Sequence, residues 1–284
     1  MRWQGGRRSR NIEDRRGSRR GGRMLGGGIG TIVIILVALY LGIDPNFLLQ
    51  GVQSVSVSDS GSQPSEQELA NDPLADMVAV VMADTEDVWN AVFSASGRTY
   101  QEPTLVLFSG STRSACGIGQ AAMGPFYCPA DQKAYIDLSF YDDMRRQFQA
   151  PGDFAQAYVI AHEVGHHVQN LLGISSNVRR QQQAVGKVEA NELSVRLELQ
   201  ADCLAGVWAN RADKARGLIE EGDVEEALNA AAAIGDDRLQ RQSGGTVVPE
   251  SFTHGTSEQR QRWFRKGLSS GNPDDCDTFS AQSL

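Results

Sequence analysis

The sequence predicts an α+β domain that is mostly helical with a small sheet, and two observations lead to this prediction. Residues 104–108 form a short run of apolar, β-prone side chains, and residues 134–140 alternate in the manner of a half-buried strand. Most of the chain after residue 150 instead repeats apolar side chains every three or four positions, as helices do. A few strands followed by many helices are typical of the α+β class.

The helices can be placed from this periodicity and from their end signals. We expect one over residues 74–93 and another over residues 153–172. In the second, Asp153 and Gln156 resemble a capping box, and Gly173 follows as a stop signal. Further helical patterns cover residues 177–210, 212–220, 223–234 and 257–267.

The N-terminal region has the pattern of a membrane anchor with one charged flank. Residues 1–23 contain nine arginines against Glu13 and Asp14, a net charge of +7, so the rest must carry −15 to give the total of −8. Residues 24–43 contain no charged side chain, and this length suits a helix that crosses a bilayer. The positive-inside rule predicts that the arginine-rich side stays in the cytosol and that the following chain emerges on the other side.

Three alternatives to a membrane anchor fit this region less well. A cleaved signal peptide should end in a small-residue cleavage site, whereas this apolar stretch leads into Asp44 and Pro45. A buried core helix should still offer a charged face to solvent, and this stretch has none. A nucleic-acid patch should interleave aromatic residues with its arginines, but only Trp3 is present, so no nucleic-acid partner is expected.

The pattern divides the chain into four parts. We expect residues 1–23 to be a cytosolic tail, residues 24–43 a transmembrane helix, residues 44–68 a flexible linker and residues 69–284 an extracytoplasmic domain. The linker is serine-rich and poor in large apolar groups. No internal repeat divides the last part, so we expect one domain there.

All four cysteines, Cys116, Cys128, Cys203 and Cys276, lie after the apolar stretch. An even number of cysteines in an oxidising compartment is most simply used in two disulfides. The sequence permits three pairings, of which we favour Cys116 with Cys128 and Cys203 with Cys276. Free buried thiols are the alternative.

The pentad His162-Glu163-Val164-Gly165-His166 predicts a zinc site. Positions four apart share one face of a helix, so both imidazoles can reach one ion while Glu163 leans toward its open side. Three of the chain's four histidines fall in this short stretch. A helix that merely exposes a polar stripe is the alternative, but it would give Glu163 no role.

Zinc in a hydrolase usually keeps three protein ligands and one open position, so a third ligand is required. A metzincin would supply a histidine where this chain has Leu172, so that class is excluded. We favour Glu198, because Asp202 lies one turn beyond it and could accept the distal N–H of a ligand histidine. Glu192 is the alternative ligand, and the carboxylate pair could instead be a solvated acidic stripe.

Two further residues are candidates for stabilising charge in a reaction. His254 lies in a loop before the last predicted helix, and we expect it to donate a hydrogen bond to the oxyanion that forms in amide hydrolysis. Arg260 is a weaker candidate for the same role, and a loop histidine that only bonds backbone groups is the alternative. His167 lies about 140° around the helix from His162, so we do not expect it at the same ion.

Six stretches of the domain together resemble those of a known family. They are CG at 116–117, GPFYCP at 124–129 with Asp131, YIDLSF at 135–140, AHEVGHHVQ at 161–169, ELQADCLAGVW at 198–208 and FTHGTSEQR at 252–260. With these residues the chain resembles the YpfJ-like neutral zinc metallopeptidases of bacteria. The resemblance implies a gluzincin-like zincin fold, a single N-terminal membrane anchor, one Zn²⁺ ion on His162, His166 and Glu198, and Glu163 as general base.

The expected function is that of a membrane-anchored zinc peptidase that hydrolyses a peptide or protein substrate. The expected location is the bacterial inner membrane, with a single pass, a cytosolic N-terminus and the catalytic domain outside the cytosol. The edge of the strand at residues 134–140 is a candidate surface for the substrate backbone. A non-catalytic, zinc-stabilised binding module and a zinc-dependent cell-wall amidase are the alternatives.

Overall fold

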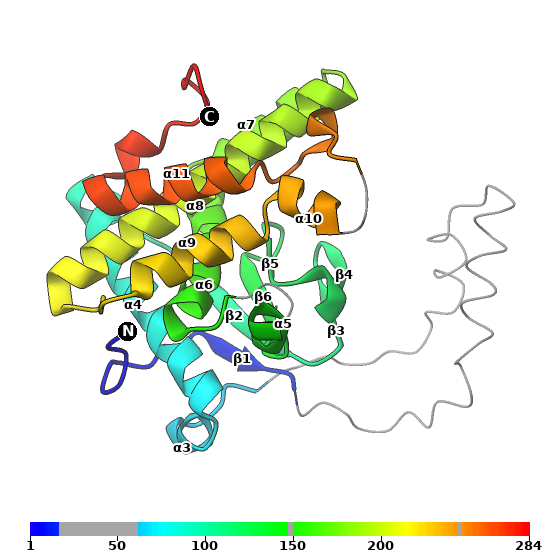
Figure 1. Ribbon diagram of the computed structural model, residues 1–284. Helices are drawn as coiled ribbons and strands as arrows, with labels where there is room; N and C mark the ends of the chain where they lie inside the picture. Colours follow the sequence, from blue (N-terminus) through cyan, green and yellow to red (C-terminus); the bar gives the residue numbers. More distant parts are fainter. Residues whose placement is uncertain (17–61, 147–149, 243–245) are drawn as a thin grey trace, which may run out of the picture.

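The structure places a small sheet beside a larger body of helices (Figure 1). It is a computed structural model and describes residues 1–16, 62–146, 150–242 and 246–284. The helix-rich α+β class predicted from the sequence is confirmed.

Four short strands form the main sheet, in the spatial order β1, β2, β6 and β5. β1 (Ile12–Asp14), β2 (Thr104–Phe108) and β6 (Lys133–Asp137) are parallel, whereas β5 (Phe126–Cys128) runs antiparallel to β6. β5 therefore forms one edge of the sheet and β1 forms the other.

Both faces of this sheet are buried, and alternate residues of β2 and β6 point to opposite sides. One face packs in the main core with α4 (Pro73–Ala95) and α6 (Asp153–Leu171) through Leu105, Leu107, Ala134 and Ile136. The other face forms a smaller cluster made up of Val106, Phe108, Cys128 and Tyr135, with Phe126 packed against it.

The glycine-rich segment between β2 and β5 forms a second, two-stranded sheet. β3 (Ser111–Ser114) pairs antiparallel with β4 (Gly117–Gln120), and the 3-10 turn η1 (Ala121–Met123) leads on to β5. The disulfide Cys116–Cys128 joins the hairpin turn to β5. Cys203 and Cys276 form the second disulfide, which joins α8 (Lys187–Arg216) to the 3-10 turn η3 (Pro273–Cys276). Both predicted pairings are confirmed.

Residues 1–16 belong to the folded domain, which corrects the prediction of a separate tail over residues 1–23. β1 pairs along its length with β2, and Asp14 also bridges to Ser62. The arginines of this segment make ion pairs with carboxylates far along the chain: Arg7 with Glu86 and Asp87, Arg8 with Asp76, and Arg16 with Asp72. Composition could not reveal these pairs, because an arginine that orients a membrane span and one that pairs within a domain look alike in sequence.

This pairing bears on the membrane topology predicted from the sequence. Strands of one sheet lie on one side of a membrane, so residues 1–16 and the chain from residue 62 onward would share a side of any membrane. The sequence predicts residues 1–23 in the cytosol and the domain on the other side of the membrane. For residues 1–16, this prediction does not agree with the pairing of β1 and β2. Among the residues described, no helix is long and apolar enough to span a membrane. The predicted span at residues 24–43 lies outside the described residues.

The helical body consists mainly of α4, α6, α8 (Lys187–Arg216), α9 (Asp223–Ala233) and α11 (Ser257–Ser270). α11 lies across α8 (Figure 1), and glycines on both helices allow the close approach. A Cβ on Gly267 would lie 1.9 Å from the carbonyl oxygen of Cys203. The helices predicted at residues 74–93, 153–172, 223–234 and 257–267 are all present, with small shifts at their ends.

The region predicted as helices over residues 177–210 and 212–220 is divided differently. α7 (Ile174–Gln182) is a separate helix, and α8 begins after Gly186, whose backbone is extended. α8 then continues until Gly217, which adopts the left-handed conformation and ends the helix. The apolar periodicity of the sequence continues across the break between α7 and α8 and across the end of α8, so periodicity alone located neither.

Two local end signals differ from the prediction. The capping box predicted at Asp153 is absent, since Gly152 precedes α6 and makes no side-chain cap. Glu226 of α9 caps this helix end instead, because its Oε2 accepts the N–H of Phe154 at 3.2 Å. The strand predicted at residues 134–140 ends at Asp137, whose carboxylate accepts backbone N–H groups from Gly110 and Ser139.

Candidate metal centre

α6 and α8 pack closely at the zinc-type pentad. A Cβ on Gly165 would lie 3.0 Å from the carbonyl oxygen of Ala201 and 3.1 Å from its Cα. Because Gly165 has no side chain and Ala201 a small one, the two backbones approach closely enough for side chains of α8 to reach the histidines of α6.

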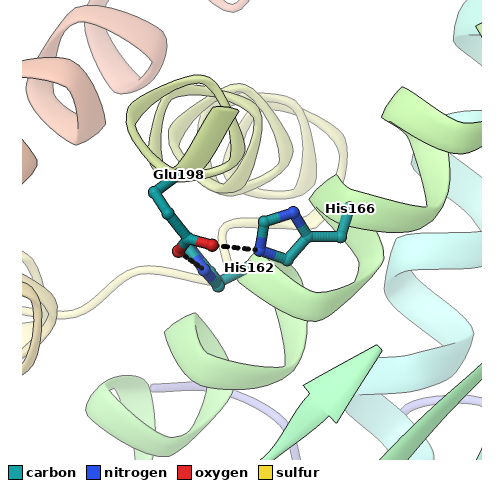
Figure 2. Close-up of side chains that lie close together, drawn as sticks. All are labelled: His162, His166 and Glu198. Atoms are coloured by element: carbon teal, nitrogen blue, oxygen red, sulfur yellow. Dashed lines mark hydrogen bonds and ion pairs between the residues drawn. The ribbon is translucent and has the colours of Figure 1, made fainter. Parts of the chain in front are cut away.

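Three donor side chains meet at this crossing: His162 and His166 from α6 and Glu198 from α8 (Figure 2). Nε2 of His162 lies 3.2 Å from Oε2 of Glu198, and Nε2 of His166 lies 3.4 Å from Oε1. Donor atoms of the three residues all lie within 4.8 Å of one another, so they could hold one ion. Two imidazoles and one carboxylate are a donor set found in catalytic zinc sites.

His162 is oriented by Asp202, the position predicted for this role. Nδ1 of His162 lies 2.8 Å from Oδ1 of Asp202. Arg260 donates to both carboxylate oxygens at 2.8 and 2.9 Å, and Tyr158 donates its hydroxyl at 2.5 Å. An ionised carboxylate only accepts hydrogen bonds, so Nδ1 of His162 carries the proton and Nε2 is left as the donor atom for a metal.

The charges at this crossing favour a bound cation. Burial raises the pKa of Asp202, but Arg260 and His162 lower it more, to about 2. Burial likewise raises the pKa of Glu198, yet the two histidines hold it well below its ordinary value. Burial lowers the pKa of His162, and the charge of Asp202 raises it overall, to about 10. Two ionised carboxylates therefore stabilise positive charge at the imidazoles, which is what a divalent ion supplies.

Glu163 lies beside the three donors in a cleft of about 670 Å³. Its side chain is buried, and burial raises its pKa. It is not one of the three clustered donors, so its carboxylate is left for proton transfer. A raised pKa suits a carboxylate that must accept a proton near neutral pH.

The walls of the cleft come from the sheet side and from α7. The sheet side contributes Met123, Phe126, Tyr127 and Phe140, and α7 contributes Val178 and Arg179. Met123 is 71% exposed, so an apolar side chain is displayed at this wall. The cleft is therefore mainly apolar along its walls and charged where the donor residues lie.

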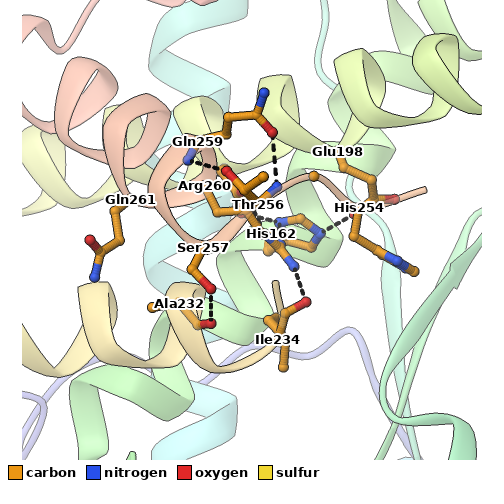
Figure 3. Close-up of polar contacts among 12 residues, drawn as sticks. His162, Glu198, Ala232, Ile234, His254, Thr256, Ser257, Gln259, Arg260 and Gln261 are labelled. Atoms are coloured by element: carbon orange, nitrogen blue, oxygen red, sulfur yellow. Dashed lines mark hydrogen bonds and ion pairs between the residues drawn. The ribbon is translucent and has the colours of Figure 1, made fainter. Parts of the chain in front are cut away.

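His254 also lines the cleft, near Glu198 (Figure 3). Nδ1 of His254 lies 3.2 Å from Oδ1 of Asp236, and the backbone N–H of His254 donates to Oδ2 of Asp236 at 2.6 Å. Asp236 thus holds the loop and the imidazole together. Nε2 of His254 has no hydrogen bond to Asp236 and is available to a group in the cleft.

The remaining candidates from the sequence lie elsewhere or have other contacts. Arg260, the weaker oxyanion candidate, is 1% exposed, and its guanidinium is held by Asp202 beside His162 (Figure 3). Glu192 lines a different groove, together with Glu250 and Glu258, and does not join the three donors.

His167 stays away from the donors, as expected. Its Nε2–H donates to the carbonyl of Gln101 at 2.6 Å, and its Nδ1 lies 2.9 Å from the hydroxyl of Tyr127. Burial lowers the pKa of His167 to about 4, so it is neutral.

Tyr158 and Gln169 were not identified from the sequence as parts of the site. Tyr158 lies four residues before His162, and Gln169 lies three residues after His166, so each shares a helix face with a histidine donor. Oε1 of Gln169 lies 2.9 Å from Nδ1 of His166. Helix spacing could therefore have pointed to both residues, although their hydrogen bonds depend on α8 and α11.

Comparisons with known proteins agree with this site. A family model described as "Putative neutral zinc metallopeptidase" matches residues 1–279. The chain is 55% identical over 288 residues to "Uncharacterized protein YpfJ" of Escherichia coli strain K12, with 98% of this chain and 99% of that one covered. It is 42% identical over 260 residues to "Uncharacterized protein Rv2575" of Mycobacterium tuberculosis strain H37Rv, with 87% and 86% covered. No solved structure gives a significant match. The chain therefore belongs to the neutral zinc metallopeptidase family.

Proposed function

We propose that this protein is a zinc-dependent peptidase of gluzincin-like design, which hydrolyses peptide bonds with Glu163 as general base. The observation that supports this most is the meeting of His162, His166 and Glu198 beside Glu163 in one cleft. A binding module with a closed structural zinc site would have no use for this buried carboxylate.

The donor residues fit one zinc ion. Both imidazoles have their Nδ1 atoms engaged with acceptors, which leaves two Nε2 atoms facing the carboxylate of Glu198. Zinc bound there would make water a stronger acid and would polarise the substrate carbonyl.

Glu163 would take the proton of the attacking water on its carboxylate and pass it to the nitrogen of the leaving amine. Its burial supports this role, because a carboxylate with a raised pKa can hold the proton between the two transfers. Nε2 of His254 would donate a hydrogen bond to the oxygen of the substrate carbonyl as negative charge develops there. Asp236 would keep that imidazole in place.

The substrate backbone would add to β5 rather than to the strand expected from the sequence. β6 lies between β2 and β5, so both of its edges are paired. β5 is an edge strand, and Phe126 and Tyr127 of this strand line the cleft. An extended peptide could therefore pair with β5 and place its side chains against apolar walls.

We also propose that the protein is attached to the bacterial inner membrane through residues 24–43, with the catalytic domain outside the cytosol. The two disulfides support an oxidising compartment, since such bonds are rare in cytosolic proteins. Because β1 pairs with β2, residues 1–16 and the domain would lie on the same side of the membrane, so we propose neither the cytosolic tail nor a single pass through residues 24–43.

The variant Glu163→Gln tests the proposed activity, because it keeps the shape of the side chain and removes its basicity. We expect full zinc content and a rate of peptide hydrolysis lower by at least roughly 10²- to 10⁴-fold, as for a lost general base. Glu192→Gln is the matched control and should cleave at the parent rate.

A Glu163→Gln variant that cleaves as fast as the parent would contradict the mechanism. If neither the parent nor the variant cleaved any member of a broad peptide library, the result would favour a non-catalytic binding module. Cleavage of cell-wall peptides alone would favour the amidase.

A further inference from the structure

A chain of buried amides leads away from the second histidine donor. Nδ1 of His166 lies 2.9 Å from Oε1 of Gln169. Nε2 of Gln169 donates to the carbonyl of Leu197 at 2.7 Å and to Oε1 of Gln200 at 3.1 Å. Nε2 of Gln200 in turn donates to the carbonyl of Cys276 at 3.0 Å.

The two backbone carbonyls fix the direction of every hydrogen bond in this chain. A carbonyl oxygen only accepts, so the amide nitrogen of Gln169 must face Leu197 and that of Gln200 must face Cys276. The oxygen of Gln169 therefore faces His166 and can only accept from it. Nδ1 of His166 accordingly carries a proton, and Nε2 is the nitrogen that faces Glu198.

The far end of this series of hydrogen bonds, at Cys276, is held by a disulfide. Cys276 is bonded to Cys203, which lies three residues after Gln200 on α8 and therefore on the same side of that helix. This bond keeps the carbonyl of Cys276 against Gln200. Gln169 and Cys203 have no exposed surface, and Gln200 is also buried, so water does not compete for these contacts.

We propose that Gln169 is a positioning residue that sets the tautomer and orientation of His166, and that the disulfide Cys203–Cys276 secures it through Gln200. This inference rests on the proposed zinc site. The two histidines thus have different supports: His162 uses the charged Asp202, whereas His166 uses a neutral amide that Leu197 and Gln200 hold in one direction.

The first test compares Gln169→Leu with the parent by two measurements that need no substrate. Competition with a chromophoric chelator gives the zinc dissociation constant, which should rise roughly 10- to 100-fold, as for other lost supports of metal ligands. In ¹⁵N-labelled, zinc-loaded protein, the Nδ1–H signal of His166 should shift and exchange faster with solvent. The Nδ1–H signal of His162 should stay in place, because Asp202 is unchanged.

Two variants separate this role from a general loss of structure. Gln169→Glu retains an acceptor for Nδ1–H but loses the N–H groups that face Leu197 and Gln200, so it should restore part of the zinc affinity. Gln156→Leu makes the same kind of change on α6, at a residue whose Oε1 has no hydrogen-bond partner among the described residues, and should leave both measurements unchanged.

The second test removes each disulfide in turn. Cys203→Ser with Cys276→Ser should weaken zinc binding and shift the Nδ1–H signal of His166 in the same direction as Gln169→Leu. Cys116→Ser with Cys128→Ser is the matched control and should not shift that signal.

Parent affinity and an unchanged His166 signal in Gln169→Leu would overturn the proposal. Equal shifts of the His162 and His166 signals would also overturn it, because they would indicate a general disturbance of the helices. Neither measurement involves hydrolysis, so a protein that behaves as expected here but cleaves no peptide would refute the proposed function alone.

Discussion

Each donor side chain at the crossing of α6 and α8 has a neighbour that determines the position of its proton or its charge state. Asp202 accepts from His162, and Gln169 accepts from His166. The carboxylate of Glu198 is ionised, because the adjacent histidines hold its pKa well below its usual range. The site therefore brings two imidazole nitrogens and one ionised carboxylate together as donor atoms in one place.

The choice between the two candidate glutamates can be tested directly. Glu198→Ala should abolish stable zinc binding, because it removes the only carboxylate among the three clustered donors. Glu192→Ala should leave zinc binding intact, since Glu192 lines a different groove. Zinc per chain after dialysis, measured by elemental analysis, distinguishes the two variants. Loss of zinc in Glu192→Ala and retention in Glu198→Ala would reverse the assignment.

The sequence was sufficient to name the candidate donors that the structure brings together, but it did not reveal most of the contacts that support them. His162, Glu163 and His166 follow from helix spacing, and Glu198 follows from its carboxylate neighbour one turn away. Asp202 was predicted for the same reason. The roles of Gln169 and Arg260 depend on which helices pack against them, and no local pattern records that packing.

Glu198 reaches the histidines because α6 and α8 cross closely. The role of this crossing can be tested by widening it. In Gly165→Ala the added Cβ would meet the backbone of Ala201 at 3.0 Å, which forces the helices apart by a few tenths of an ångström. We expect zinc affinity to fall by about 10-fold, at the low end of losses from disturbed ligand support, and stability to fall by about 1–3 kcal/mol from overpacking.

Gly186→Ala is the matched control, because a Cβ there has nothing within 4 Å and the backbone is extended. Isothermal titration with zinc and thermal unfolding would measure both effects. Equal zinc affinities in the two variants would show that the close crossing does not set the geometry of the donors.

The loop that carries His254 depends on one carboxylate of α10 (Asp236–Gln242). Asp236 accepts the backbone N–H groups of Thr253, His254 and Gly255 at 2.7, 2.6 and 3.0 Å. Burial raises the pKa of Asp236, but the hydrogen bonds from His254 and from these backbone groups lower it overall. The stabilisation is therefore fully present above the unfolded pKa of about 4 and is lost as the pH falls through the lower folded value.

Asp236→Asn should loosen this loop at neutral pH, because the neutral amide is a weaker acceptor and its nitrogen cannot accept at all. Amide hydrogen exchange at residues 253–255 should speed up by roughly 10-fold, which corresponds to about 1.4 kcal/mol, the upper part of the range for a typical hydrogen bond. Unchanged exchange in the variant would show that other contacts hold the loop.

Helices and strands could be predicted where their own sequence has a regular apolar period and recognisable end signals. α4, α6, α9 and α11 follow the expected ranges closely. β1 was missed because it is short and its partner is β2, far along the chain. The start of α6 was misjudged for a similar reason, since Glu226 of another helix caps it.

At the scale of the whole molecule, residues 1–16 act as part of the domain. The family model begins at residue 1, so it includes this segment together with the candidate zinc site. We expect residues 1–16 and the catalytic domain to be exposed on the same side of the membrane.

Single cysteines at two exposed positions, Arg10→Cys and Gln67→Cys, can report this in intact spheroplasts. The four native cysteines are already in disulfides, so the new thiol is the one that a membrane-impermeant maleimide would label. Both variants should react to the same extent before lysis. Labelling of Gln67→Cys with protection of Arg10→Cys would restore the single-pass topology.

A crystal structure of the zinc-loaded protein, with anomalous data collected at the zinc edge, would locate the ion and its ligands. We predict one ion at about 2.0–2.2 Å from Nε2 of His162, Nε2 of His166 and a carboxylate oxygen of Glu198, the usual range for such ligands. The fourth position should be free of protein ligands and should face Glu163 across the cleft. An ion bound elsewhere, or one closed off by a fourth protein side chain, would contradict the assignment of this site as a catalytic zinc centre.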